Sequence, residues 1–219
     1  MSKVLRPLVI AAALAAAWVP AAAQNLLVNG GFEDSSSTTL APPGWFNFGA
    51  ANGVLSYSAI TTQPVYEGLR FYDIGAHGNG VAAVGEGVGQ SFASIVGATY
   101  RLTFGLSGEN FGSSVETLRV TVGNGLMDYA LTPTGSGIFA RSFTTQTFTF
   151  NALAATTTLG FVLQSFAGTP GNNDPMLDGV SVELVSLPTA PVPEPESWAL
   201  MLAGLTGLGF LQRRRRAGR

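Results

Sequence analysis

Strict alternation of apolar and polar residues is the feature that most constrains this fold. Tyr100, Leu102, Phe104 and Leu106 alternate with polar or small residues, which places the apolar set on one face of a β-strand. The same two-residue period recurs in residues 118–122, 147–150, 159–163 and 180–184. Several short, half-buried strands of this kind predict an all-β sandwich.

Turn-forming clusters separate these stretches. They are rich in Gly, Pro, Asn and Ser, the residues that reverse a chain most easily. The clusters lie at residues 41–44, 77–80, 108–110, 123–125 and 169–173. We find no internal repeat.

The C-terminus has a different pattern. Residues 198–211 contain no charge and are followed directly by Gln212 and four arginines, Arg213 to Arg216. A helix of this length measures about 21 Å, against about 30 Å for the bilayer hydrocarbon. With Trp198 at one interface and the arginines at the other, the pattern predicts a short transmembrane helix over 198–211 with its basic stub, 213–219, in the cytoplasm.

The order of elements in residues 192–219 resembles the PEP-CTERM sorting tail of exported proteins in Gram-negative bacteria that make exopolysaccharide. The resemblance rests on Pro193-Glu194-Pro195, the apolar helix and the arginine cluster. It implies recognition by an exosortase, a membrane enzyme that removes the tail. The implied sorting-signal residues are Pro193, Glu194, Pro195, Arg213, Arg214, Arg215 and Arg216.

The N-terminus predicts export. Lys3 and Arg6 precede an apolar stretch from Leu8 to Val19, and an Ala-x-Ala site ends at residue 23. This is the pattern of a signal peptide, here residues 1–23, read by the Sec export machinery and cut by signal peptidase. We therefore expect a membrane-attached precursor that becomes a cell-surface or extracellular-matrix protein.

Between these ends, residues 24–185 form one predicted domain, and the proline-rich stretch 186–191 is a linker. Eleven acidic and four basic residues in 24–191 give this part a formal charge of −7. That balance argues against nucleic acid and against an anionic lipid surface. The chain has no cysteine, so no disulfide stabilises it.

Parts of the domain resemble a galactose-binding-like jelly roll and many carbohydrate-binding modules: residues 25–33, 89–92 followed by 97–104, and 176–182. In that fold the first and last strands lie side by side, which implies that Glu33 and Asp178 are close. In carbohydrate-binding relatives, acids at these places hold a structural calcium ion. The alternative is that both acids cap turns or accept hydrogen bonds from backbone amides.

Aromatic residues are candidate ligand contacts, because sugars stack their apolar faces on such rings. The candidates are Trp45, Phe46 and Phe48, on a predicted loop after Pro42-Pro43-Gly44, and Tyr57, Tyr66 and Tyr72, on or near the following strands. A sandwich of this size also needs large side chains in its core, and core packing is the competing interpretation, particularly for Trp45.

Catalytic residues are few. His77 is the sole histidine and lies in a glycine-rich turn, and there is no Gly-x-Ser-x-Gly motif. Scattered acids could in principle act on glycans; they are Glu67, Asp73, Glu86, Glu109 and Glu116. We expect a protein that is not an enzyme and that binds exopolysaccharide. The alternatives are a self-associating structural component of a biofilm or sheath, or a glycan-active enzyme.

Overall fold

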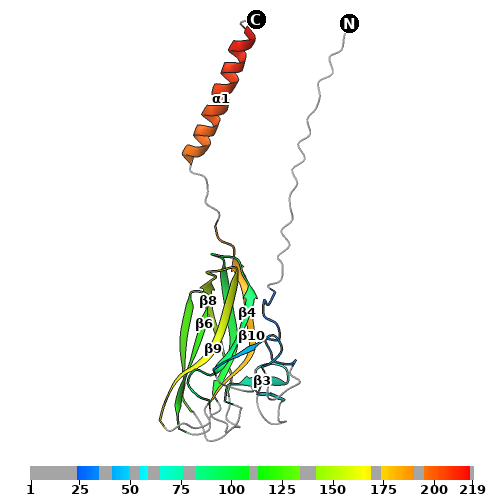
Figure 1. The fold of residues 1–219 in the computed structure, drawn as a ribbon, viewed down its shortest axis with the longest axis vertical. Coiled ribbons are helices and arrows are strands. Elements are labelled where there is room, and N and C mark those ends of the chain that lie inside the picture. The colour runs from blue at the N-terminus through cyan, green and yellow to red at the C-terminus, as the bar shows by residue number, and fades with distance from the viewer. Residues whose placement is uncertain are drawn as a thin grey trace, which may run out of the picture.

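The computed structural model describes residues 24–34, 41–49, 55–58, 65–75, 82–108, 113–133, 142–168, 174–189 and 195–217. The predicted signal peptide, residues 1–23, lies outside the described residues, as do Pro193 and Glu194. The all-β sandwich is confirmed, since two five-stranded antiparallel sheets face each other (Figure 1).

The first sheet, sheet A, has the strand order β1-β4-β9-β6-β7. Each strand pairs antiparallel with its neighbours. Its strands are β1 (Phe46–Phe48), β4 (Gly87–Ala93), β9 (Thr156–Ala167), β6 (Val115–Val122) and β7 (Gly125–Leu131).

The second sheet, sheet B, has the order β2-β3-β10-β5-β8, again antiparallel throughout. Its strands are β2 (Leu55–Ser58), β3 (Arg70–Asp73), β10 (Pro175–Ser186), β5 (Thr99–Gly108) and β8 (Thr144–Asn151).

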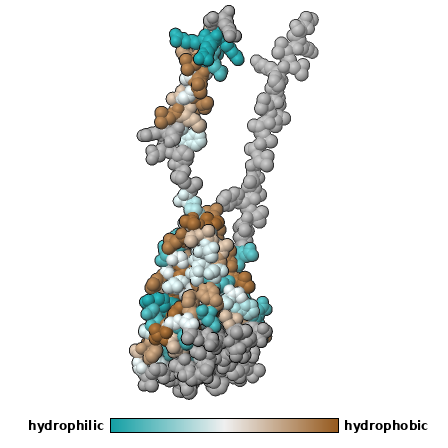
Figure 2. Space-filling model, viewed as in Figure 1, coloured by the Kyte–Doolittle hydropathy of each residue, from teal (hydrophilic) through white to brown (hydrophobic). Residues whose placement is uncertain are grey.

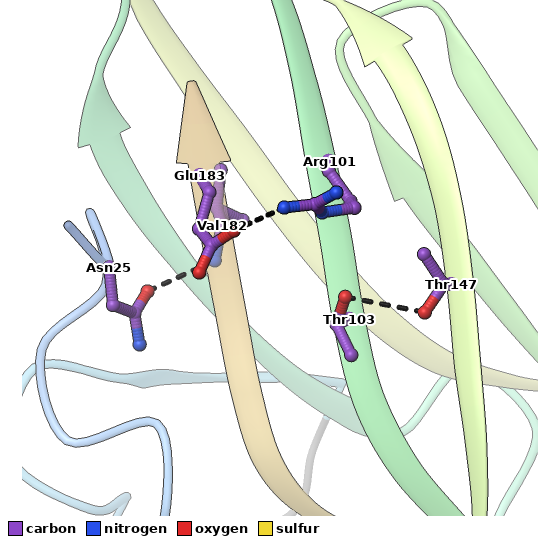
Figure 3. Close-up of polar contacts among 6 residues, drawn as sticks. All are labelled: Asn25, Arg101, Thr103, Thr147, Val182 and Glu183. Carbon is purple, nitrogen blue, oxygen red and sulfur yellow. Dashed lines mark hydrogen bonds and ion pairs between the residues drawn. The ribbon is translucent and has the colours of Figure 1, made fainter. Parts of the chain in front are cut away.

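The N-terminal segment lies beside the last strand, as the jelly-roll resemblance implies. The backbone amide of Leu26 donates to the carbonyl of Val182 (2.9 Å), and the amide of Val180 donates to the carbonyl of Gly30 (2.9 Å). The Asn25 side chain accepts from the amide of Val182 (3.0 Å; Figure 3). The segment therefore continues the edge of β10 beyond the two residues that pair with β3.

The core lies between the sheets and is lined by the apolar half of each alternating strand. Phe104 of β5 and Phe161 of β9 meet edge to face, with ring centroids 5.1 Å apart. Tyr100 stacks on Phe150 of β8 at 5.6 Å. All four are at most 2% exposed. The period-two pattern thus predicts correctly which residues of these strands face inward.

A tight turn at the start of the domain aims one side chain inward and the next outward. Phe32 has a φ of 56°, unusual for a residue with a side chain, and its ring is fully buried between Trp45 (5.1 Å) and Tyr72 (5.2 Å). Glu33, the next residue, points to the loop that precedes β3.

The C-terminal helix, α1, spans Pro195–Ala217, and its apolar side chains are exposed. No helix within the described residues is long and apolar enough to cross a membrane. The predicted transmembrane helix over 198–211 is therefore corrected: a helix is present there and extends further at both ends. The reason is its composition, because only 16 uncharged residues, 197–212, separate Glu196 from Arg213.

Candidate functional site: two outer faces of the sandwich

Two of the predicted ligand-binding aromatics belong to the core. Trp45 is 7% exposed, contacts the ring of Phe32, and donates from Nε1 to the carbonyl of Asn29 (3.0 Å). Tyr72 is fully buried, and burial raises the pKa of its hydroxyl well above the ordinary value. A ligand cannot stack on either ring, so for Trp45 and Tyr72 the core-packing interpretation is the correct one.

Tyr66 lies outside the core, on the outer face of sheet B. Its ring covers Gly105 and Gly179, where an added Cβ would come within 2.5 Å and 2.7 Å of ring carbons. Its hydroxyl lies 2.9 Å from the Thr145 hydroxyl. Tyr66 thus holds a loop on the sheet. Tyr57 belongs to β2, and its side chain lies outside the described part of the structure.

Sheet A carries a different aromatic feature on its outer face. Phe46 and Phe48 alternate with Asn47 along β1, so both rings project from the same face, with centroids 5.2 Å apart. The rings lie over glycines: a Cβ on Gly89 would come within 2.6 Å of Phe48 and 2.8 Å of Phe46. A Cβ on Gly160 would come within 3.1 Å of Phe48. We call Phe46, Phe48, Gly87, Gly89 and Gly160 the aromatic platform.

Strand register places polar groups beside the platform. One cross-strand row runs Phe48, Gly87, Val162, Arg119 and Asp128, and the next runs Phe46, Gly89, Gly160, Thr121 and Leu126. A third row pairs the hydroxyls of Ser91 and Thr158 at 2.9 Å. The outer face of sheet A therefore combines the exposed ring of Phe46 and the half-buried ring of Phe48, glycines beneath them, and hydrogen-bonding groups.

The charged pair on this face is a two-point contact. Arg119 donates from Nε to Oδ1 of Asp128 (2.8 Å) and from Nη2 to Oδ2 (2.7 Å). These hydrogen bonds lower the pKa of Asp128 and raise that of Arg119. Both side chains are about one-third exposed, at 34% and 38%, so the pair stays accessible to a ligand.

On the outer face of sheet B, polar side chains are hydrogen-bonded to one another. Arg101 donates to Glu183 (2.7 Å), and the hydroxyls of Thr103 and Thr147 lie 3.3 Å apart (Figure 3). Beyond these pairs the face is covered by Tyr66. The Tyr66 ring in turn contacts that of Phe143 (6.4 Å), which contacts Phe71 of β3 (5.8 Å).

Glu33 and Asp178 both accept hydrogen bonds from backbone amides of one loop, residues 66–70. Oδ2 of Asp178 accepts from the amides of Tyr66 and Glu67 (2.9 Å each), and Oδ1 accepts from Gly179 (2.7 Å). Oε1 of Glu33 accepts from the amides of Leu69 (2.7 Å) and Arg70 (2.9 Å). The two acids thus bind the same loop, as their predicted proximity requires. The interpretation that both accept hydrogen bonds from backbone amides is confirmed.

A third acid, Glu67, reaches the same turn, since a Cβ on Gly31 would come within 2.7 Å of its Oε1. Carboxylate oxygens suit calcium, a hard cation. In this arrangement, however, Glu33 and Asp178 accept amide hydrogens, and the described residues contain no group of three or more His, Asp or Glu side chains placed to hold a metal ion. The calcium ion thus stays a prediction.

Burial explains the electrostatics of Asp178. The residue is fully buried, and desolvation raises the pKa of its carboxyl to about 6. The three amide hydrogen bonds oppose this rise, and the negative charge of Glu67 adds to it. The Asp178 carboxylate fixes the loop of residues 66–70 to β10, and burial of its charge costs free energy.

Among the acids considered for catalysis, Asp73 and Glu86 lie near enough to the buried Tyr72 hydroxyl for their charges to add to the rise of its pKa. Glu86 accepts from the amide of Ala83 (2.7 Å), Asp73 from that of Gly75 (3.0 Å), and Glu116 from the hydroxyl of Ser114 (3.2 Å). Each therefore has a local structural partner. His77 and Glu109 lie outside the described residues.

Of the predicted aromatic contacts, Phe46 and Phe48 form the platform, and they lie on strand β1 rather than on the expected loop. Their shared position over glycines was not predicted. The available signal was the run Gly85-x-Gly87-x-Gly89, in which glycines recur with the two-residue period of a strand. Glycine at alternate strand positions indicates that another group approaches that face closely. At Gly89 the approaching groups are the rings of β1, whereas at Gly87 they are backbone atoms of Phe161 and Val162.

In the described part of the sorting tail, the four arginines, Arg213 to Arg216, lie in the last turns of α1 and are exposed. The guanidinium carbon of Arg214 lies 6.0 Å from the centre of the Phe210 ring. Pro195 is the first residue of the helix, the position that proline tolerates best.

Comparison with known proteins identifies the tail. The model of the PEP-CTERM protein-sorting motif matches residues 191–216. This motif implies export, sorting to the cell surface and processing by an exosortase. None of the curated proteins compared with the chain matches it.

Solved structures resemble the domain. The tandem CBM22 domains of Xyn10C from Paenibacillus barcinonensis align at 15% identity over 80% of this chain and 48% of theirs, with a TM-score of 0.51. A cyclase from Fischerella sp. TAU aligns at 17% identity over 77% of this chain and 100% of its own, with a TM-score of 0.50. Likeness at this identity shows the fold alone. The chain thus joins a PEP-CTERM sorting motif to a β-sandwich like that of the jelly-roll carbohydrate-binding modules.

Proposed function

We propose that this exported protein binds extracellular polysaccharide through the aromatic platform on the outer face of sheet A. The observation that carries the proposal is the placement of Phe46 and Phe48. Phe46 is 40% exposed on β1, the edge strand of sheet A, and both rings lie over glycines with their planes inclined at 66°. Pyranose rings stack their apolar C–H faces on surfaces of this kind.

The groups around the platform supply the polar half of such a site. Arg119 and Asp128 present donors and acceptors in one row, and the hydroxyl of Thr121 lies in the next. A sugar that stacks on Phe48 would place its hydroxyls toward these groups, because they follow in the same cross-strand rows. Stacking supplies affinity, and directional hydrogen bonds supply selectivity.

Charge favours a neutral polymer. Residues 24–191 carry a formal charge of −7, which repels acidic polysaccharides from the domain. The CBM22 likeness supports a carbohydrate-binding role as far as fold can, while the cyclase likeness shows that the same fold also serves enzymes. We propose a binding role because Asp73, Glu86 and Glu116 each have a local structural partner.

The proposed place of action is the cell surface or extracellular matrix of a Gram-negative bacterium, reached through the Sec machinery and signal peptidase. The exosortase step follows from the sorting motif. Exopolysaccharide made by the same cell is the proposed ligand. The membrane is a partner only until the tail is removed.

Affinity electrophoresis of the exported protein in gels that contain neutral or acidic polysaccharide tests the proposal. Retardation by a neutral polymer is expected, and Phe46→Ala should reduce it strongly. Phe166→Ala is the matched control, because Phe166 of β9 is similarly exposed, at 38%, but lies outside the platform.

Equal loss in both variants, or no retardation by any polymer, would overturn the proposal. Shortening of the polymer would indicate the glycan-active enzyme instead. Aggregation of cells that depends on the protein without polymer binding would indicate the structural component.

A further inference from the structure

One end of the sandwich carries a cluster of exposed aliphatic side chains, and Figure 2 shows hydrophobic surface gathered where the chain leaves the domain toward α1. Their exposed fractions range from 41% to 67%. The cluster, here called the apolar tip, consists of Ile95, Val96, Leu153, Leu184, Val185 and Leu187. Exposed apolar patches of this kind mark surfaces that meet another phase or partner.

Strand register shows that these residues share one end. Residues 94–98 connect β4 to β5, and residues 152–155 connect β8 to β9. Thr99, at the start of β5, pairs with Asn151 at the end of β8 and with Ser186 at the end of β10. The two connections and the end of β10 therefore lie together.

The backbone holds these side chains outward. The amide of Ser94 donates to the carbonyl of Ala155 (2.8 Å), and the amide of Gly97 donates to that of Ala152 (2.9 Å). The amide of Ile95 donates to the hydroxyl of Tyr100 (2.9 Å). Because both connections are hydrogen-bonded to each other, the exposed side chains cannot fold inward without breaking these bonds.

The tip is uncharged, unlike the rest of the domain. Residues 94–100, 151–159 and 184–189 contain no Asp, Glu, Lys, Arg or His. The nearest charges in these strands, Arg101 and Glu183, neutralise each other in an ion pair of 2.7 Å. The tip can therefore approach a neutral lipid surface without placing a net charge in it.

A cavity of about 220 Å³ adds apolar surface at the same end. Leu26, Ile95 and Leu184 line it together with Ala93, Ser94 and Tyr100. Only Ser94 and the hydroxyl of Tyr100 contribute side-chain polar groups, and both are already hydrogen-bonded, to the carbonyl of Ala154 and the amide of Ile95.

Chain continuity identifies the partner. Eight residues lead from Leu187 in the tip to Pro195, the start of α1, and can span at most about 28 Å. Between Trp198 and Leu211 helix α1 has no charged residue, and its leucines are 58–74% exposed. Because the connecting segment is so short, the same lipid surface can bury both exposed apolar regions.

We propose that the apolar tip rests on the membrane surface while the sorting tail is attached, with its aliphatic side chains among the lipid headgroups. The domain then stands on its end, and the outer face of sheet A remains turned to the side for its ligand. Removal of the tail leaves the tip with too little apolar area to hold the domain, so release follows cleavage. The inference is independent of polysaccharide binding.

The natural absence of cysteine allows a site-specific test on the full chain. Val96→Cys and Leu153→Cys each place one thiol in the tip for an environment-sensitive fluorophore. Ser113→Cys is the matched control, an exposed residue just before β6 at the opposite end of the sandwich. Each labelled chain is mixed with phosphatidylcholine vesicles, with and without lipids that carry a quencher in the headgroup region.

The expected result is a blue shift and quenching by the lipid-borne quencher for V96C and L153C, and neither for S113C. Tip probes that behave like S113C would overturn the proposal. A blue shift that requires no vesicles and grows with protein concentration would also overturn it, because the tip would then contact a second copy. Polymer retardation should be the same in all three variants, which separates this test from that of the aromatic platform.

Discussion

The two outer faces of the sandwich use the same local arrangement with opposite results. On each, an aromatic ring lies on glycines: Phe48 on Gly89 and Gly160 in sheet A, and Tyr66 on Gly105 and Gly179 in sheet B. The surroundings of the ring differ. Tyr66 is held by Thr145, and its loop by Asp178 and Glu33, whereas Phe46 beside Phe48 keeps its ring open to solvent.

This difference shows that an aromatic ring on a glycine floor does not by itself identify a binding site. In sheet B the ring and its acids fix a loop, so their removal should affect folding. In sheet A the phenyl rings make no hydrogen bonds that hold a loop, so their removal should affect binding. Each of the following predictions separates these two consequences.

The largest effect is expected for Asp178→Ala. The substitution leaves three backbone amides without their acceptor and should lower the free energy of unfolding by about 4 kcal/mol, since each unpaired buried group costs about 1 kcal/mol or more. Urea unfolding at neutral pH measures the loss. Asp128→Ala, on the outer face of sheet A, should stay close to the parent protein because its ion pair is exposed. Equal losses in the two variants would remove the distinction between the faces.

The second prediction concerns pH. Burial raises the pKa of Asp178 to about 6, above its value in an unfolded chain, so the folded state binds the proton more tightly. The contribution of this group to stability is therefore fully present below about pH 4 and is lost as the pH rises toward 6, by about 3 kcal/mol at most. Unfolding measured at several pH values should show this slope in the parent protein, and Asp178→Asn should lack it. A slope that persists in Asp178→Asn would assign it to another group.

Much of sheet B could be predicted from the sequence, because its information is local. Period-two alternation predicts which residues of β5 face inward, since Tyr100, Leu102 and Phe104 are all at most 2% exposed. Glu33 and Asp178 bind the same loop, residues 66–70, and this agrees with the pairing of the first and last strands in the resembled fold. These features depend on the strand period or on a known topology.

The aromatic platform could not be predicted in the same way. Its rows join five strands that are far apart in sequence, and only the register brings Phe48 and Arg119 into one row. Composition also misleads at Trp45 and Phe46, which are adjacent aromatic residues. One is in the core and the other is on the surface, because successive side chains of an extended chain point to opposite faces.

The third prediction concerns calcium. If Glu33 and Asp178 hold the predicted ion, free calcium at ten times its dissociation constant should stabilise the fold by about 1.4 kcal/mol, and chelation should lower the melting temperature by several degrees. Glu33→Gln should abolish the difference between chelated and calcium-containing samples. Asp34→Asn is the control, because Asp34 is an exposed neighbour whose amide, not its carboxylate, bonds Asn29. Melting curves that do not change with chelator would leave Glu33 and Asp178 with the amide-bonding role alone.

The smallest effect, and the most direct comparison of the faces, is expected for Tyr66→Phe. Loss of the hydroxyl contact with Thr145 should cost about 1 kcal/mol of stability, the usual net value of one hydrogen bond. Polymer retardation should be unchanged, since the ring still covers Gly105. Phe46→Ala should do the reverse, because it removes an exposed ring that no core residue needs. If Tyr66→Phe instead weakened polymer binding while Phe46→Ala did not, the ligand would lie on sheet B, and the open ring on sheet A would have no assigned role.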